Sequence, residues 1–211
     1  MRLTVLGATG GIGKLLIPLA LDRGHEVTAF ARAPEKIASN GSSALRSHPN
    51  LRIVGGDLFN TRQMADVIGS SDAVLSAFGP TTLRPTHLRR DFGRSLVQAL
   101  RSAGVSRFIH VSSAFCFTGE GGLLYTIMTN TLFRNVTIDH CDADNEMSQS
   151  GLDWTILRPP RLTDGPAAGN LRVTAGHLAK GLTITRADVA RFMLQEATNP
   201  HYVRQYVGLS S

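Results

Sequence analysis

The sequence has few of the features that mark secreted, membrane-spanning or metal-stabilised proteins. Its 211 residues include only two cysteines, Cys116 and Cys141, which are too few for a disulfide framework and lack metal-ligand spacing. We expect both to be small apolar filler, and no metal site. No apolar run reaches the roughly 18 residues of a membrane span, and the first residues have no signal-peptide pattern. These absences favour a cytoplasmic protein without a membrane partner.

Aromatic residues are also scarce, at 6%, and the net charge of +6 comes from arginines scattered along the chain. No dense basic run occurs, and no set of aromatics suited to base stacking accompanies the arginines. Solvated surface charge explains this balance, so we expect no nucleic-acid partner. The length, together with a hydrophobic content of 42%, fits one globular domain.

Short β-rich runs alternate with amphipathic stretches, which predicts a doubly wound α/β fold with a mostly parallel sheet and helices on both faces. The expected strands are residues 3–6, 26–31, 51–54, 73–77, 107–111 and 154–157. The expected helices are 12–23, 34–36, one from 61, 87–103 and 139–149. Residues 160–211 are predicted to form a small extension on the substrate side, with strands at 171–174, 182–185 and 202–209 and a helix at 187–197.

Two helices carry clear local signals. Spacing along the first helix predicts one apolar stripe facing the sheet, made of Ile12, Leu15, Leu16, Leu19 and Ala20. Gly24 is expected to end this helix. Asn60, followed three residues later by Gln63, predicts the N-terminal cap of the helix that begins at residue 61.

The first strand is followed directly by the glycine motif Gly7-Ala8-Thr9-Gly10-Gly11-Ile12-Gly13, which opens the first helix. Gly7 permits a tight turn, Gly10 lets the backbone approach a pyrophosphate, and Gly13 allows close helix–strand packing. The helix N-terminus offers N–H groups to phosphates. Residues 1–211 are therefore predicted to be a single Rossmann-type NAD(P)-binding domain. The residues expected at the cofactor are Gly7, Thr9, Gly10, Gly11, Ile12 and Gly13.

The end of the second strand indicates which nicotinamide nucleotide is bound. An acidic residue there accepts hydrogen bonds from the ribose 2′-hydroxyl, whereas an arginine accommodates a 2′-phosphate. Arg32 occupies this place, 19 residues after Gly13, and no acid accompanies it. Lys36 can assist from the next short helix. The sequence therefore favours NADP(H) over NAD(H).

Two further segments follow strands at the same edge of the predicted sheet. After the third strand, Asp57-Leu58 can meet the adenine, with the carboxylate accepting from the amino group and a neighbouring N–H facing the ring. Asn60 already serves as the helix cap, which favours this functional interpretation of Asp57. After the fourth strand, Phe78-Gly79-Pro80 would bring backbone close to the cofactor, although a simple tight turn explains it equally well.

Three later segments carry a family resemblance: Phe108–Ala114 (FIHVSSA), Ser150–Pro159 (SGLDWTILRP) and Arg186–Ala190 (RADVA). Together with the glycine motif, Arg32 and Asp57-Leu58, they resemble the atypical short-chain dehydrogenases/reductases. Within that group the chain is similar to the small NAD(P)H-binding members of the flavin reductase/biliverdin-IXβ reductase type. The resemblance covers nearly the whole length.

The resemblance implies a set of residues at the reactive end of the cofactor. Ser113 would lie beside the nicotinamide as the catalytic residue, and Ser112 would contact the cofactor. His140 and Pro159-Pro160 would close this end, although an ordinary helix-start histidine is an equal interpretation of His140.

The sequence departs from ordinary short-chain dehydrogenases at their Tyr-x-x-x-Lys pair. Tyr125 stands 13 residues after Ser112, an acceptable separation, but Thr129 occupies the lysine position. Without lysine, a tyrosine with a pKa of about 10 is a poor base at neutral pH. Tyr125 is therefore predicted to be a packing residue, and the usual alcohol dehydrogenase chemistry is disfavoured.

Two functions stay open. The first is an NADPH-dependent reductase of a planar conjugated acceptor, a flavin, quinone or tetrapyrrole, which needs a stacked hydride donor and a proton from solvent. The acceptor would be walled by Phe115, Phe117, Leu123, Leu124 and Tyr125, a stretch that ordinary core or a dimer contact explains equally well. The second is a non-catalytic NADP(H)-binding regulatory or sensor protein. A sugar-nucleotide epimerase usually needs the Tyr–Lys pair and a larger substrate domain. We expect a monomer or homodimer with a small-molecule partner.

Overall fold

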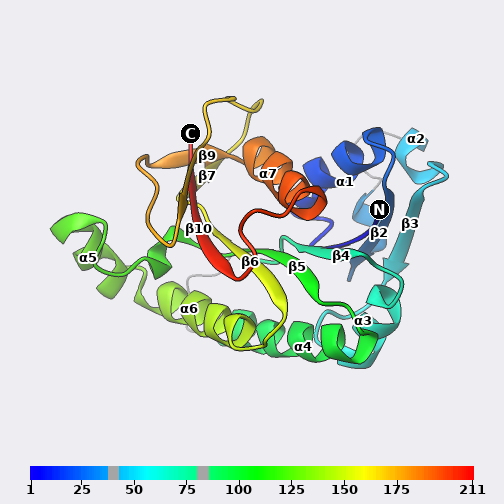
Figure 1. The fold of residues 1–211 in the computed structure, drawn as a ribbon, viewed down its shortest axis with the longest axis horizontal. Helices are drawn as coiled ribbons and strands as arrows, with labels where there is room; N and C mark the ends of the chain where they lie inside the picture. Colours follow the sequence, from blue (N-terminus) through cyan, green and yellow to red (C-terminus); the bar gives the residue numbers. More distant parts are fainter. Residues whose placement is uncertain (38–42, 80–85) are drawn as a thin grey trace.

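The computed structural model describes residues 1–37, 43–79 and 86–211. Its centre is an eight-stranded sheet with the order β3-β2-β1-β4-β5-β6-β10-β8, and β7 and β9 pair separately (Figure 1). All neighbouring strands in the large sheet run parallel except β8, which is antiparallel to β10. This is the predicted doubly wound Rossmann-type fold.

The elements follow the predicted order with shifted boundaries. The strands are β1 (Arg2–Leu6), β2 (Glu26–Ala31), β3 (Leu51–Gly55), β4 (Ala73–Ser76), β5 (Arg107–Val111), β6 (Asp153–Arg158), β7 (Arg161–Thr163), β8 (Arg172–Ala175), β9 (Thr183–Thr185) and β10 (Gln205–Ser210). The helices are α1 (Gly13–Asp22), η1 (Pro34–Ile37), α2 (Ser43–Arg46), α3 (Thr61–Ile68), α4 (Leu88–Ala103), η2 (Ala114–Cys116), α5 (Gly122–Asn130), α6 (Arg134–Ser148) and α7 (Arg186–Thr198). Strand β7 and helices α2, η2 and α5 were not predicted, and α6 begins five residues before the predicted start at 139.

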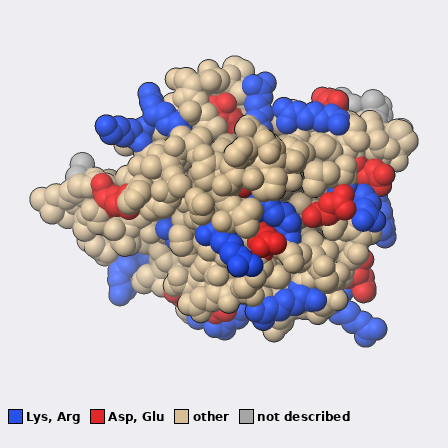
Figure 2. Space-filling model, in the orientation of Figure 1, with Lys and Arg blue, Asp and Glu red and all other residues tan. Residues whose placement is uncertain are grey.

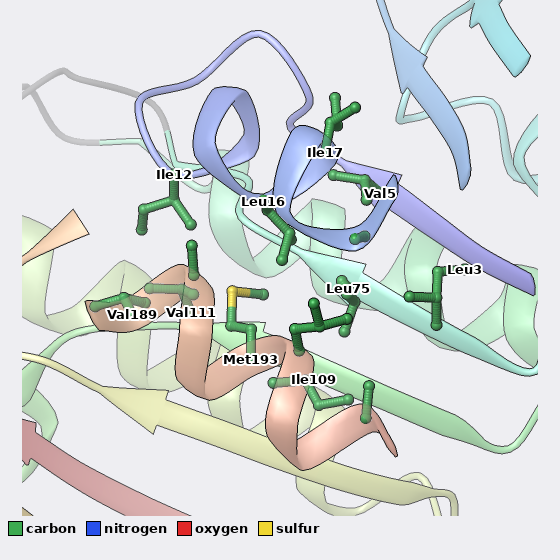
Figure 3. Packing of buried hydrophobic residues seen from close by; sticks show 14 of the residues in the cluster. Leu3, Val5, Ile12, Leu16, Ile17, Leu75, Ile109, Val111, Val189 and Met193 are labelled. Atoms are coloured by element: carbon green, nitrogen blue, oxygen red, sulfur yellow. The ribbon is translucent and has the colours of Figure 1, made fainter. Parts of the chain in front are cut away.

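Helices cover both faces of the sheet, as Figure 1 shows, with α1 and α7 on one side and α3, α4 and α6 on the other. In the first layer, Leu16 of α1 and Met193 of α7 pack in one buried cluster with Ile109 of β5 (Figure 3). In the second, Phe92 of α4 packs with Phe108 of β5. The central strands β1, β4, β5 and β6 are buried on both sides, which explains their continuous apolar runs.

The apolar stripe of α1 differs from the predicted one. Leu15 is 41% exposed, whereas Ile17 and Leu21 are buried. The segment contains two overlapping sets of apolar residues at helical spacing, and either set could form the buried face. Packing against α7 and the sheet decides which set is buried. The predicted ends are confirmed: Gly24 donates its N–H to the Leu21 carbonyl, and the Asn60 side chain accepts from the Gln63 N–H at 3.0 Å.

The two cysteines are not separate filler residues, which corrects the prediction. Cys116 of η2 and Cys141 of α6 form a disulfide with their Cα atoms 5.5 Å apart. Their separation of 25 residues carries no local signal, because α6 comes beside η2 only when the chain folds back. The disulfide links the segment after β5 to the helix that carries His140.

Charge and apolar surface are distributed unevenly. On the visible face, Figure 2 shows lysine and arginine interspersed with acidic residues, while the end formed by α5 is mostly uncharged. Leu123, Ile127 and Leu132 are 79%, 50% and 70% exposed there. Across the described ranges, no helix has the length and apolar character that crossing a bilayer requires.

Candidate functional site

The glycine motif forms the turn between β1 and α1. Gly7 has a φ of +77°, and a side chain there would lie 2.7 Å from the carbonyl carbon of Ala77. A Cβ on Gly13 would collide with the Gly7 carbonyl oxygen, and Gly10 donates its N–H to that oxygen at 2.9 Å. The turn therefore depends on glycine for its conformation and for close approach, as the spacing predicted.

The start of α1 faces this turn without a side-chain cap. Within the described residues, Ile12 at the N-cap position makes no capping hydrogen bond, and the first turn contains no acid. The positive end of the helix dipole is therefore suited to an anion such as a diphosphate.

A cleft of about 420 Å³, which we call the glycine cleft, opens beyond β1, β2 and β4. It is lined by Gly7, Thr9, Gly10, Ala31, Arg32, Ala33, Lys36, Leu58, Phe59, Ala77, Phe78, Gly79 and Leu88. Seven predicted site residues meet there: Gly7, Thr9, Gly10, Arg32, Leu58, Phe78 and Gly79. Others lie outside its lining: Gly11, Ile12, Gly13, Asp57, Ser112, Ser113, His140 and Pro159. Pro80 is outside the described residues.

The end of the glycine cleft that lies beyond β2 is basic. Arg32 follows β2 directly and lines the cleft together with Lys36 of η1, and no acid occurs among the described lining residues. Arg32 forms no hydrogen bond or ion pair with another described residue. The cleft therefore contains a guanidinium with no acid beside it in the described lining, at the position where Rossmann-type domains bind a 2′-phosphate.

Asp57 has local contacts that the sequence interpretation did not include. Its Oδ1 accepts from the Phe59 N–H at 3.1 Å, and its own N–H donates to Gln63 Oε1 at 3.0 Å. The carboxylate is thus part of the turn between β3 and α3. Leu58, its neighbour, is the residue that lines the cleft.

Some lining residues were missed by the sequence analysis. Phe59 and Ala77 adjoin predicted residues, so a wider window around each motif would have included them. Leu88, at the start of α4, carries no local signal, since the chain returns to the cleft only in the folded molecule.

Ser112 and Ser113 follow β5 and have different surroundings. Ser112 is buried, and its hydroxyl lies 3.4 Å from Nδ1 of His140 on α6. Ser113 accepts from the Phe115 N–H at 3.3 Å and lines a second hollow. The next N–H, that of Ala114, donates to the Pro159 carbonyl at 2.8 Å, which ties the ends of β5 and β6 together.

Buried ionisable groups lie behind these serines. Burial, with a smaller effect of nearby Arg89, lowers the pKa of His110 to about 3, and its Nδ1 is 3.0 Å from Ser76 Oγ. Burial also holds the pKa of His140 well below its usual 6.5. Both imidazoles are therefore neutral at neutral pH.

The carboxyl group of Asp144 on α6 is buried in the same region. Its Oδ2 accepts from Arg158 Nε at 2.9 Å, and burial raises its pKa to about 6 despite the opposing effects of Arg158 and Ser112. The Arg158 guanidinium also lies over the Tyr206 ring, 3.7 Å from its centroid. This pair fixes α6 against the end of β6.

A second hollow of about 700 Å³, which we call the aromatic cavity, opens beyond β5 and β6. It is lined by Ser113, Ala114, Phe115, Gly121, Tyr125, Met128, Phe133, Pro160, Arg161, Leu178, Gly181 and Leu182. Phe115 and Phe133 stack at 4.9 Å between ring centroids. Of the predicted wall, Phe115 and Tyr125 line the cavity, whereas Phe117 and Leu123 do not, and the Leu124 side chain is outside the described part of the chain.

Tyr125 is unsuited to acid–base chemistry. Burial raises its pKa to about 12. Thr129, at the lysine position of the usual pair, donates its hydroxyl to the Tyr125 carbonyl at 3.1 Å. A phenol with so high a pKa stays protonated throughout the physiological range.

Arg186, at the start of α7, lies over the glycine motif. A Cβ on Gly11 would be 2.7 Å from its Cδ, and its Nη1 pairs with Asp164 Oδ1 at 2.7 Å. The resemblance included Arg186 in a motif without giving it a place. Only the packing of α7 beside α1 brings it to this turn.

Comparison with known proteins agrees with this geometry. A family model described as NAD(P)H-binding matches residues 7–200. A chloroplastic Arabidopsis thaliana protein of uncharacterised function is 33% identical over 181 residues, which are 81% of this chain and 62% of that protein. The chain thus spans less than two thirds of that relative's length.

Two solved structures resemble the whole chain. A Streptococcus pneumoniae protein, described provisionally as an NADH-flavin reductase, is 27% identical with a TM-score of 0.81, covering 100% of this chain and 99% of its own. A Veillonella parvula short-chain dehydrogenase/reductase in complex with NADP has a TM-score of 0.84 over 100% of this chain and 94% of its own. At 19% identity, the second likeness concerns the fold alone.

Proposed function

We propose that this chain, which belongs to the NAD(P)H-binding family, is an NADPH-dependent reductase of planar conjugated acceptors such as flavins, quinones or tetrapyrroles. The observation that carries the proposal is the placement of two hollows along one edge of the sheet. The glycine cleft lies beyond β1, β2 and β4, and the aromatic cavity lies beyond β5 and β6. In open α/β sheets, ligands bind at this carboxyl edge.

The residues of the glycine cleft fit a dinucleotide. The side-chain-free turn at Gly7 and Gly10 would hold the diphosphate against the uncapped start of α1. Arg32, with Lys36 beside it, would bind a 2′-phosphate, which favours NADPH over NADH. Leu58 and Phe78 would supply apolar contact, and Asp57 would act through the turn that presents Leu58.

From β1 to β5 the sheet crosses two strand spacings, about 10 Å in all. A nucleotide extended along this edge from Gly7 would bring its other end toward Ser112 and Ser113. Ser113 would orient the reacting groups, while Ser112, His140 and Pro159 would close this end of the site. When bound, the nicotinamide would supply the hydride.

The aromatic cavity would hold one flat face of the acceptor against the stacked rings of Phe115 and Phe133 and exclude water. Because Tyr125 keeps its proton and the histidines are neutral, the proton that follows the hydride would come from solvent. We also propose that residues 1–211 act as one NAD(P)-binding domain in which 160–211 form the acceptor side. Arg161, Leu178 and Leu182 support this, since all three line the cavity.

Steady-state oxidation of NADPH with FMN, riboflavin and menadione tests the proposal. We expect turnover with at least one acceptor and a lower KM for NADPH than for NADH. Tight NADPH binding without turnover of any acceptor would contradict the reductase proposal and assign a sensor instead.

The experiment has a matched pair of glycine variants. Gly13→Ala should abolish nucleotide binding and turnover, because its Cβ meets the Gly7 carbonyl oxygen. Gly69→Ala places a methyl group at the exposed end of α3, with Ala65 O at 3.4 Å, and should behave as the wild type. Circular dichroism of both variants separates loss of binding from loss of folding.

A further inference from the structure

The charge of the aromatic cavity is unbalanced. Its described lining contains one charged side chain, that of Arg161, and no acid. The other lining residues are aromatic, aliphatic or small, apart from Ser113 and the buried phenol of Tyr125. Arg161 is an exposed residue, so beside a neutral ligand its guanidinium would stay solvated by water, whereas an anionic ligand would form charge-assisted hydrogen bonds with it.

Strand pairing holds the backbone of Arg161 in place, whereas no hydrogen bond or ion pair from the described residues holds its side chain. It begins β7, directly after Pro159-Pro160, and pairs in register with Thr183 of β9. Its side chain forms no ion pair or hydrogen bond with any residue in the described ranges. Two other arginines in this half of the chain differ, because Arg158 pairs with Asp144 and Arg186 pairs with Asp164.

The acid that borders the cavity already has other partners. Glu120 accepts from the Leu178 N–H through Oε2 at 2.7 Å, and its Oε1 lies 3.3 Å from His177 Nδ1. Glu120 thus holds the Leu178 wall in place.

We propose that the acceptor is a planar molecule carrying a phosphate or carboxylate group, and that Arg161 is the residue that selects it. The inference rests on the proposed reductase function and narrows its substrate class. The rings of Phe115 and Phe133 would contact the flat conjugated part. The guanidinium, whose planar fork matches carboxylate and phosphate oxygens, would bind the acidic substituent.

FMN and riboflavin form a matched pair of probes, because they share one ring system and differ by a phosphate. Quenching of flavin fluorescence, measured with NADP⁺ present, gives both dissociation constants without turnover. We expect the wild type to bind FMN about tenfold more tightly than riboflavin. Arg161→Gln should remove this preference by weakening FMN alone, and Arg161→Lys should retain part of it. Arg191→Gln, which changes an exposed arginine of α7 outside the cavity lining, is the control.

A second pair, 1,4-naphthoquinone-2-sulfonate and menadione, repeats the comparison with a smaller ring system. The proposal would be overturned if the wild-type protein showed no preference for the anionic compound in either pair. An Arg161→Gln variant that weakens both members of a pair equally would also overturn it. Anion-selective binding without NADPH oxidation would support the role of Arg161 while rejecting the reductase function. Failure of the Arg161 proposal and failure of the reductase proposal therefore give different results.

Discussion

Arg32 stands where the chain leaves β2, and its guanidinium has no counter-charge among the described residues that line the glycine cleft. A guanidinium at this place gains a charge-assisted contact only with a nucleotide that carries the extra phosphate. Under the proposed function, the distinction between the two nicotinamide nucleotides would therefore depend on the Arg32 side chain, with Lys36 in support.

Replacement of Arg32 by alanine should raise the dissociation constant for NADPH at least tenfold, or about 1.4 kcal/mol. The dissociation constant for NADH should stay nearly unchanged, because NADH has no phosphate for Arg32 to bind. Isothermal titration with both nucleotides measures the difference. Arg52→Ala, on an exposed position of β3, is the control. Equal losses for both nucleotides would refute the assignment.

Two buried ionisable residues make the stability of the fold depend on pH in opposite directions. The pKa of His110 falls from 6.5 to about 3 in the fold, so its contribution to stability is lost as pH drops below 6.5. The pKa of Asp144 rises from 3.8 to about 6, so its contribution is present below 3.8 and lost as pH rises toward 6.

His110→Asn should reduce the destabilisation on acidification, because asparagine takes up no proton when the chain unfolds. Between pH 7 and pH 5, we expect the loss of unfolding free energy to be smaller than in the wild type by roughly 2 kcal/mol. Urea unfolding at both pH values measures this change, and exposed His201→Asn is the control. An unchanged pH slope in His110→Asn would contradict the depressed pKa.

At the scale of elements, the disulfide connects η2, which follows β5, to α6, which carries His140. Cys116 belongs to η2, which supplies part of the cavity wall, and Cys141 follows His140 on α6. The Cys116 carbonyl also accepts from Arg158 Nη1 at 3.2 Å. One covalent link and one charged hydrogen bond thus hold η2 against its neighbours.

Reduction of this disulfide should lower stability by about 3 kcal/mol, since it frees a loop of roughly 25 residues in the unfolded chain. For a chain of this length, the midpoint of thermal unfolding should fall by about 6–12 °C. Scanning calorimetry with and without dithiothreitol measures the shift, and the double variant Cys116→Ala/Cys141→Ala should be insensitive to the reductant. Two free thiols in unreduced protein, detected by mass spectrometry, would contradict the link.

At the scale of the whole molecule, the two hollows share one rigid edge. The strands beneath them, β1, β4, β5 and β6, are consecutive neighbours in the sheet, and helices cover both faces. The residues that line the two hollows come from segments far apart in the sequence, from the glycine motif to β7, and a ligand bound along this edge would contact them together.

NADPH should therefore stabilise the entire fold. At a concentration of 100 times its dissociation constant, it should add about 2.7 kcal/mol, which corresponds to roughly 5–10 °C for a chain of this length. NADH at the same concentration should give a smaller shift. Thermal unfolding in a nucleotide series measures both, and the absence of any shift with saturating NADPH would contradict nucleotide binding.

The local sequence was sufficient to predict the succession of most strands and helices along the chain, the first glycine turn and several helix ends. These features depend on neighbouring residues: alternating apolar runs define strands and helices, Gly7 meets a positive φ, and Asn60 caps α3. Arg32, Leu58 and Phe78, which the sequence predicted at the cofactor, line one cleft, because the carboxyl ends of parallel strands meet at one edge. Their contact with a cofactor stays a prediction.

Tertiary packing alone determined the remaining features. The cystine, the place of Arg186 over Gly11, the lining role of Leu88 and the buried surroundings of Asp144 all involve segments distant in sequence. The sequence by itself therefore determined the fold class and the glycine turn, through interactions within a few residues. Tertiary structure decided the rest: the aromatic cavity, the one charged side chain in its described lining, and the shifted pKa values. Each depends on burial or on contacts between distant segments, and these exist only in the folded chain.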